Sequence, residues 1–441
     1  MTKSRFIPSA FLLSLLLPPA AFAGAQDIPG RPGLGSAIFV HPDGAGVSAW
    51  EAARVFSVGP DGELAWDRLE HVGIYKGHMK NSLGATSHGG ATSHAFGVKV
   101  AWDSYGMDGT DPLTSLSGKP FSILREAKDA DLATALVNSG HIAEPGTGVF
   151  AASSASREAT DAISLQIIES GTDIILSGGE VLLLPEGEVG RHGLVGVRTD
   201  GLNLIERARE LGYEVVYTRA ELMALPNHAR KVLGVFSGYH TFNDYTEEEL
   251  RADELPLYKA TAPTVAEMTR VALRLLKARN ERFLLVVEEE GSDNFANVNN
   301  AIGAMTALTR ADAALGVALD FVERNPETLL LTAADSDAGG MQVYPIRDPD
   351  PNVPFMVLPP TTRNGGVLDG IDGTETSPFM SMPDQFGKRW PFAIAWASFD
   401  DNLGGIVARA HGQNADLLPV TVDNTDIYRI LYATLFGVWL P

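Results

Sequence analysis

Short apolar runs alternate with helical segments along most of the 441-residue chain, and this alternation limits the possible folds more than any other feature. Runs such as "SAIFV", "RFLLVV" and "TLLLT" are almost continuously apolar, which is typical of strands that are buried on both faces. Segments between them, such as "TVAEMTRVALRLLKARN", carry apolar residues at helical spacing. This order predicts an α/β fold with a mostly parallel central sheet and helices on both faces.

The first residues differ from the rest of the chain. Lys3 and Arg5 give a basic start, an apolar stretch follows, and "AFAGA" supplies small residues at about residue 25. This pattern predicts a signal peptide over residues 1–25, with an apolar stretch too short to span a bilayer. We therefore expect an exported protein, periplasmic or extracellular and not associated with a membrane, in which residues 26–441 form one domain.

A second departure lies at about residues 338–400, which are rich in Pro, Gly and Asp and show little periodicity. Long connections without regular structure in compact domains usually serve as lids or binding loops. We expect this segment to be an insertion that forms a cap over one end of the sheet.

Composition excludes some classes of function. The formal net charge is −21, which is unfavourable for binding the nucleic-acid backbone. The chain has no cysteine, so disulfides, thiolate metal sites and a sulfatase motif built on an oxidised cysteine are excluded. Any metal ion must be held by carboxylate, imidazole, amide or hydroxyl groups or by water.

Acidic residues follow directly after several of the predicted strands: Asp43, Glu288, Asp293, Asp335 and Asp337. A single acid at such a place is usually a solvated loop residue or a helix cap. Parallel strands, however, bring their carboxyl ends to one edge of the sheet, where ligands bind. Because carboxylates that meet at one edge repel one another, the repetition indicates bound cations.

A further candidate is the stretch "NSLGATSHGGATSHAFGVKV" (81–100), where small and hydroxyl residues lead into a predicted helix. A serine at the start of that helix would lie beside free N–H groups and the positive end of the helix dipole, which suits a phosphate group. The alternative is an ordinary Ser or Thr helix cap.

The stretches "HPDGAG", "TSHGGATSHAFGVK", "IAEPGTGVFAASSASR", "EEEGSDNFAN", "TAADSD" and "AHGQ" follow one another along nearly the whole chain after residue 25. In type and order they resemble the motifs of the alkaline phosphatase superfamily. The resemblance implies that family's fold and the hydrolysis of small phosphate monoesters, with two or three divalent cations and a possible homodimer.

By position, the resemblance makes Ser87 the nucleophile that forms a phosphoserine intermediate and Arg157 the residue that binds the phosphate oxygens. It also implies a set of metal ligands at positions where the acids remain. In this set Asp43 bridges two metal positions, and the other members are Glu288, Asp293, Asp335 and His411.

At three positions the chain differs from the family pattern. Asn297 and Ser336 stand where the resemblance calls for zinc-binding histidines, and Glu144 stands at the threonine of the magnesium site. Because oxygen donors suit hard cations, we expect Mg²⁺, with Ca²⁺ or Mn²⁺ as alternatives and Zn²⁺ less well suited.

The remaining acids and histidines have weaker signals. Strand alternation directs Glu289 to the opposite face from Glu288, toward a basic or helix-N-terminal partner, and places Glu290 behind the direct ligands. We expect structural or solvated roles for the other histidines, which are His41, His88, His94, His141, His228 and His240.

Two other functions remain open at this stage. One is a phosphodiesterase or phosphonate hydrolase on the same scaffold. The other is a noncatalytic protein that binds phosphate or cations.

Overall fold

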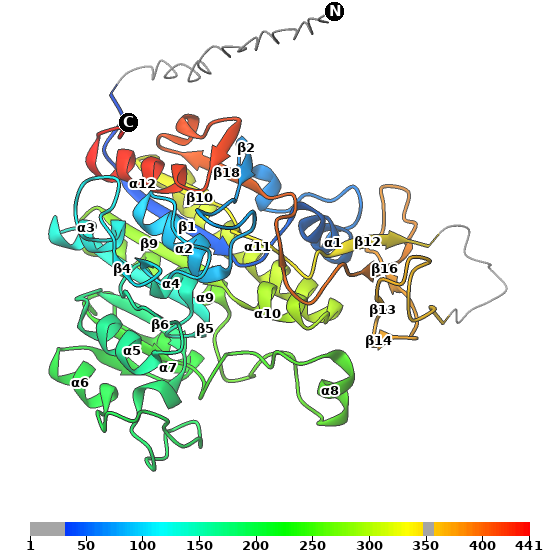
Figure 1. Cartoon of the computed structure of the whole chain (residues 1–441), viewed down its shortest axis with the longest axis horizontal. Helices are drawn as coiled ribbons and strands as arrows, with labels where there is room; N and C mark the ends of the chain where they lie inside the picture. The colour runs from blue at the N-terminus through cyan, green and yellow to red at the C-terminus, as the bar shows by residue number, and fades with distance from the viewer. Residues whose placement is uncertain (1–30, 347–356) are drawn as a thin grey trace, which may run out of the picture. The chain divides into compact units, whose positions relative to one another are not determined.

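The structure is a computed structural model that describes residues 31–346 and 357–441 (Figure 1). Residues 32–441 form one compact unit. The predicted signal peptide at 1–25 and the middle of the predicted insertion, 347–356, lie outside the described residues.

A 10-stranded sheet runs through the molecule in the order β19-β2-β18-β10-β1-β9-β5-β6-β8-β7. Its central strands are buried along their whole length, as the apolar runs predict. Parallel pairing joins every neighbouring pair except those that include β18. The strands are β1 (Ser36–Pro42), β2 (His71–Lys76), β5 (Ala133–His141), β6 (Ile174–Gly178), β7 (Glu214–Val216), β8 (Val232–Val235), β9 (Phe283–Glu289), β10 (Thr328–Thr332), β18 (Val407–Gly412) and β19 (Thr421–Asp423).

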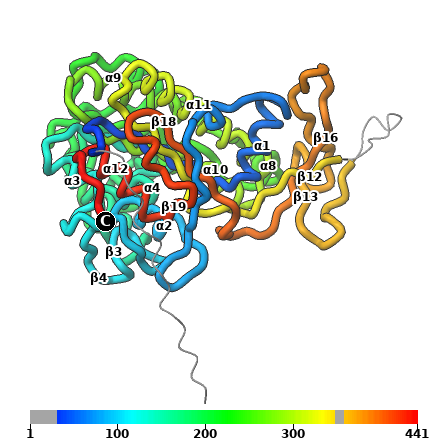
Figure 2. The backbone as a smooth tube through the Cα atoms, turned by 90° about the horizontal axis from the view of Figure 1, so that it is seen from above, coloured from blue at the N-terminus to red at the C-terminus, as the bar shows by residue number. Residues whose placement is uncertain are grey.

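Helices cover both faces of this sheet. On one face α9 (Val265–Lys277) and α11 (Ala301–Arg324) pack on the central strands, and on the other α3 (Ile123–Asp129) and α12 (Asp426–Phe436) do so (Figure 2). The predicted α/β fold with a mostly parallel sheet between helical layers is confirmed. The other helices are α1 (Val47–Ser57), α2 (Ser87–Phe96), α4 (Pro145–Gly148), α5 (Thr160–Glu169), α6 (Leu204–Glu210), α7 (Arg219–Ala224), α8 (Glu247–Ala252) and α10 (Gly291–Asn297).

The sequence sets the start and the buried face of the long helices. Thr264 caps α9 by accepting a bond from the N–H of Glu267, whose side chain bonds back to Thr264 in a capping box. Within residues 31–346 and 357–441, one helix, α11, is long and apolar enough to cross a membrane by length and composition. About half of that stretch, 56%, is buried, and α11 packs on α9, α10 and the sheet as a core helix.

The predicted insertion contains more regular structure than its sequence indicates. It holds a small sheet in the order β12-β16-β13-β14, with β15 paired to β16, so the expectation of an irregular connection is wrong for the described part. These strands of two to five residues are too short to show a clear periodicity, which explains the weak sequence signal. The strands are β12 (Gln342–Pro345), β13 (Leu368–Gly370), β14 (Gly373–Thr374), β15 (Phe379–Met380) and β16 (Pro391–Ala395).

A second pairing holds the base of the insertion. There β11 (Asp337–Ala338) pairs antiparallel with β17 (Asp401–Asn402), which sets Ala338 opposite Asp401. The chain therefore leaves for the insertion and returns from it at one place, directly after β10.

Two buried acids link the insertion to α8 and give a testable pH dependence. Burial and the nearby Asp369 raise the pKa of Glu247 to about 8, while burial raises the pKa of Asp369 to about 7. The folded state therefore holds protons that the unfolded chain releases near pH 4.5, so stability should fall as the pH rises from about 5 to 8.

The variant Glu247→Gln should flatten this loss, because glutamine has no charge to bury. Thermal unfolding between pH 5 and 8 measures the effect, with the exposed Glu254→Gln as the control. An unchanged slope in Glu247→Gln would contradict the buried-acid explanation.

Candidate active site

The carboxyl ends of β1 and β9 bring three acids together. The register pairs His41 of β1 with Glu288 of β9, which puts Asp43 beside the end of the neighbouring strand. Oxygens of Asp43, Glu288 and Glu290 lie within 4.8 Å of one another, and all three side chains are buried. Glu290, expected behind the ligands, is thus a member of the cluster itself.

The next strand, β10, adds Asp335 to the same edge. His41 Nε2 lies 3.5 Å from Asp43 Oδ1 and 3.9 Å from Asp335 Oδ1. The other ring nitrogen, Nδ1, lies 3.1 Å from the carbonyl of Ala333. Burial opposes the charge of His41, but Asp43 and Glu288 raise its pKa, so a cation at Nε2 would replace the proton that faces Asp43. A histidine whose other ring nitrogen is held by a backbone carbonyl is common among metal ligands.

Ser87 reaches this edge on the first turn of α2. Its predecessor Thr86 is the N-cap and accepts a bond from the N–H of Gly89. Gly90 allows the helix to come close, because a Cβ there would lie 2.3 Å from the Cβ of Asp335. Ser87 is buried and is among the groups that lower the pKa of Asp43.

The cluster holds more negative charge than its surroundings can stabilise. Burial opposes ionisation of Asp43, but His41 is the main group that lowers the pKa of this acid to about 2. Burial and the charge of Asp43 then raise the pKa of Glu288 to about 8 and that of Asp335 well above its usual value. Burial and the charge of Asp401 likewise raise the pKa of Asp293 well above its usual value.

Asp401 is a site residue that sequence reasoning missed. It arrives on β17 and, with Asp293, faces Asn297, whose amide nitrogen lies 3.1 Å from an oxygen of each carboxylate. The amide oxygen of Asn297 instead accepts a bond from the N–H of Gly339. Asn297 therefore holds two acids together, and it would offer its oxygen to a cation only after the amide turned over.

The structure does not bring His411 to this cluster. His411 pairs with Leu330 in the middle of β10, and its Nδ1 lies 3.9 Å from Glu70. The reason is the direction of β18. Because this strand is antiparallel, its first residues, and not its last, lie at the edge where β1, β9 and β10 end. Asp401, which precedes β18, lies at that edge instead.

The expected place of Glu144 also needs correction. Thr147, not Glu144, contacts Glu288, with its hydroxyl 3.1 Å from Glu288 Oε2. Asn138 donates a bond to the same oxygen. The cause is a three-residue offset between "EPG" and the threonine, which one sequence alone does not reveal.

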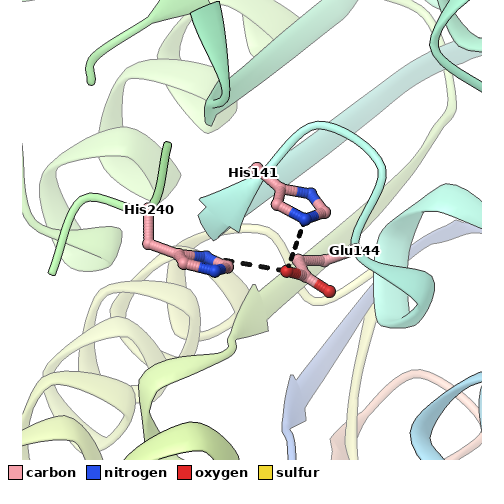
Figure 3. Close-up of side chains that lie close together, drawn as sticks. All are labelled: His141, Glu144 and His240. Atoms are coloured by element: carbon pink, nitrogen blue, oxygen red, sulfur yellow. Dashed lines mark ion pairs between the residues drawn. The ribbon is translucent and has the colours of Figure 1, made fainter. Parts of the chain in front are cut away.

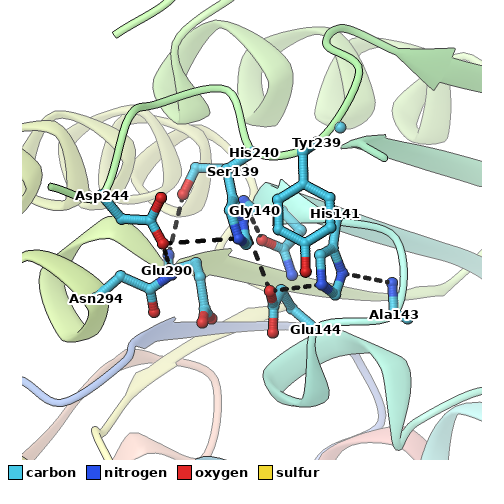
Figure 4. Close-up of polar contacts among 12 residues, drawn as sticks. Ser139, Gly140, His141, Ala143, Glu144, Tyr239, His240, Asp244, Glu290 and Asn294 are labelled. Carbon is cyan, nitrogen blue, oxygen red and sulfur yellow. Dashed lines mark hydrogen bonds and ion pairs between the residues drawn. The ribbon is translucent and has the colours of Figure 1, made fainter. Parts of the chain in front are cut away.

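Glu144 turns toward His141 and His240 (Figures 3 and 4) and also lies beside Arg157. Its Oε1 lies 3.0 Å from His141 Nε2 and 3.6 Å from His240 Nδ1, while its Oε2 lies 3.5 Å from Arg157 Nη2. Although burial opposes ionisation, these three partners lower the pKa of Glu144 to about 2. The structure thus brings His141 and His240, expected to be structural or solvated, to the acidic edge.

Arg157 lies at the rim of the cluster with a partly exposed side chain. Burial opposes the charge of Arg157, but the nearby acids raise its pKa, Glu144 most strongly, followed by Glu290, Asp293 and Asp43. A guanidinium in this place presents a planar pair of donors to an anion that reaches the cluster.

The remaining predicted residues lie in different surroundings. Glu289 faces away from the cluster, where Ser139, Tyr258 and the N–H of Gly291 donate to it. The remaining predicted ligand, Ser336, is buried next to Asp401. Two more histidines have structural partners, His88 with Asp103 and His94 with Tyr75, and His228 is exposed.

The residues at this edge suit divalent cations. Among the described residues, neither carboxylate oxygen of Asp43 or Asp335 has a hydrogen-bond donor, nor does Oε1 of Glu288 or the hydroxyl of Ser336. Buried carboxylates without donors or counterions are costly. One cation could be held by Asp43 and Asp335 with His41. A second could be held by Asp293 and Asp401, and a third by Asp43, Glu288 and Glu290.

Comparison with known proteins adds family information to this geometry. The family model described as alkaline phosphatase matches residues 36–357. The chain is 28% identical to streptomycin-6-phosphate phosphatase of Streptomyces griseus, over 93% of this chain and 97% of that protein. It is 27% identical to membrane-bound alkaline phosphatase of Bombyx mori, over 81% of this chain and 71% of that protein.

Solved structures show the same fold. The alkaline phosphatase of Thermus thermophilus has a TM-score of 0.70 and 22% identity, covering 96% of both chains. A variant of the TAB5 alkaline phosphatase with Mg bound has a TM-score of 0.68 and 18% identity, covering 92% of this chain and 99% of that one.

Cation binding should stabilise the protein through the buried acids. Adding Mg²⁺ to protein stripped with a chelator should raise its unfolding temperature. At a Mg²⁺ concentration a hundredfold above Kd, the free energy of unfolding should increase by about 2.7 kcal/mol. Asp335→Asn should shrink this rise yet leave the stripped protein no less stable, because it replaces an acid whose ionisation burial and Asp43 oppose. The exposed Asp253→Asn is the control, and an equal Mg²⁺ response in Asp335→Asn would refute the assignment.

Separate substitutions of Asp401 and His411 test which of the two residues is a metal ligand. Asp401→Ala should lose about one bound cation per chain, whereas His411→Ala should keep all of them. Elemental analysis after equilibrium dialysis measures both. The reverse result would restore His411 as the ligand.

Proposed function

The chain belongs to the alkaline phosphatase family and is a phosphatase that hydrolyses phosphate esters, and we propose that it acts on phosphate monoesters through a phosphoserine intermediate on Ser87. The observation that carries this proposal is the position of Ser87. It lies buried at the first turn of a helix, beside Asp43 and at the edge where the unpartnered carboxylates meet.

In the proposed first step, Ser87 Oγ gives up its proton to water and attacks phosphorus, so that a new O–P bond forms. The bond from phosphorus to the leaving oxygen breaks, and this oxygen takes up a proton from water to become the alcohol. The N–H groups of the first turn of α2 would face the phosphoryl oxygens, and Arg157 would bind two of these oxygens with its planar fork. In the second step water attacks the phosphoserine and releases inorganic phosphate, which frees Ser87 for another cycle.

The cations, when bound, would lower the pKa of the serine hydroxyl and stabilise the leaving oxygen. The donors favour hard cations, with Mg²⁺ first and Ca²⁺ or Mn²⁺ as alternatives, because Asp293, Asp401 and Asp43 offer oxygen. His41 adds an imidazole to the site formed by Asp43 and Asp335, so this site is the one best suited to Zn²⁺ or Mn²⁺.

Small phosphorylated metabolites are the proposed substrates. Streptomycin 6-phosphate belongs in a substrate panel because a relative that matches over nearly its whole length bears that name. Export and a homodimer are part of the same proposal, supported by the N-terminal sequence pattern and by the family. Cell fractionation and size-exclusion chromatography test them.

Ser87→Ala should lower the hydrolysis of a chromogenic phosphate monoester by at least about a thousand-fold, because the nucleophile is lost. Ser170→Ala, at the C-cap of α5, is the matched control. Mass spectrometry of acid-quenched wild-type protein should find the phosphate on the peptide that contains Ser87.

Undiminished hydrolysis in a folded Ser87→Ala variant would rule out this nucleophile. Faster cleavage of diesters than of monoesters would favour a phosphodiesterase instead, and phosphate binding without turnover under any cation would favour a binding protein.

A further inference from the structure

We propose that His141, Glu144 and His240 form a separate binding site for a divalent transition metal, with Zn²⁺ as the cation best suited to it. One donor atom from each residue lies within 4.8 Å of the others, and all three side chains are buried. The residues come from three places in the chain: the end of β5, the turn that leads into α4, and the segment after β8 (Figure 3).

The spacing of the donor atoms suits a small cation. Two ligand atoms that are each about 2.0–2.1 Å from a tetrahedral zinc ion lie about 3.3 Å apart. Glu144 Oε1 lies 3.0 Å from His141 Nε2 and 3.6 Å from His240 Nδ1, on either side of that value. Only small side-chain movements would therefore place all three atoms around one ion.

An unpartnered nitrogen points into this site. Among the described residues, His240 Nδ1 has no hydrogen-bond partner, although the side chain is only 5% exposed and the nitrogen faces Glu144. On the other side of the ring, Nε2 lies 3.9 Å from Asp244, which Asn294 holds by a hydrogen bond (Figure 4). A carboxylate behind a histidine is the usual outer partner of a metal ligand.

His141 needs one rearrangement to bind a metal. Its Nδ1 accepts a bond from the N–H of Ala143, so Nε2 carries the proton that points at Glu144. A metal at Nε2 requires that proton to move to Nδ1, and Ala143 then loses its acceptor. His240 needs no such change and is the stronger of the two anchors.

The donor set separates this site from the carboxylate cluster. Two imidazoles and one carboxylate suit Zn²⁺, Co²⁺ or Ni²⁺, whereas a set of oxygens suits Mg²⁺ or Ca²⁺. His240 and Asp244 both line a cavity of about 430 Å³, so this side of the proposed site is open to solvent. A cation there would also compete with Arg157 for Glu144, which links the site to the phosphate-binding residue.

Cobalt is the probe for this site because four-coordinate Co²⁺ absorbs visible light more strongly than six-coordinate Co²⁺. Full-length protein is stripped with a chelator, loaded with excess Mg²⁺ and titrated with Co²⁺. The wild type should bind about one Co²⁺ more than the His141→Ala/His240→Ala variant and show a strong visible band that the variant lacks.

The control variant His78→Ala/His228→Ala removes two exposed histidines and should keep the band. Equal Co²⁺ binding and equal spectra in wild type and His141→Ala/His240→Ala would overturn the proposal. In that case Glu144 would serve only as a proton acceptor between the two histidines.

Anomalous diffraction from Zn²⁺-soaked crystals of the wild type gives a second test that needs no variant. A peak between His141, Glu144 and His240 supports the proposal, and a Zn²⁺-saturated crystal without that peak overturns it. Neither readout depends on hydrolysis, so the outcome is independent of the function proposed for Ser87.

Discussion

Repulsion among buried carboxylates is the constraint on which the rest of this structure depends. A parallel sheet brings the ends of β1, β9 and β10 to one edge, and each of these ends carries acids. His41 stabilises the charge of Asp43, but the same charge then opposes ionisation of Glu288 and Asp335. The fold therefore creates a place where cations are needed before all of the acids can ionise, and Ser87 and Arg157 lie beside it.

The sequence predicts the fold and half of the site well, for a physical reason. Continuous apolar runs report strands buried on both faces, and the acid that follows each parallel strand must lie at the shared edge. This reasoning places Asp43, Glu288, Asp293 and Asp335 at one edge of the sheet, where the structure also has them. Their position depends only on where a strand ends and not on any contact between distant residues.

The remainder depends on contacts that one sequence does not record. The reversed direction of β18 moves His411 to the middle of β10 and brings Asp401 to the edge. The acids in "FDDNLGG", directly before an apolar run, were a signal for Asp401 only if that run was known to be antiparallel. His240 was missed likewise, because its partner Glu144 is distant in the chain and contact between them depends on how β5 and β8 are placed.

The paired base of the insertion has a consequence for how the protein is made. Asp335 and Asp401 are separated along the chain by the whole insertion, and the β11–β17 pair closes that long loop. Closing a loop of this length costs entropy that only later contacts recover. During synthesis, the strands that carry Asp43 and Glu288 can assemble well before Asp401 emerges, so the acidic edge acquires its last carboxylate only when the C-terminal part of the chain folds back onto β10.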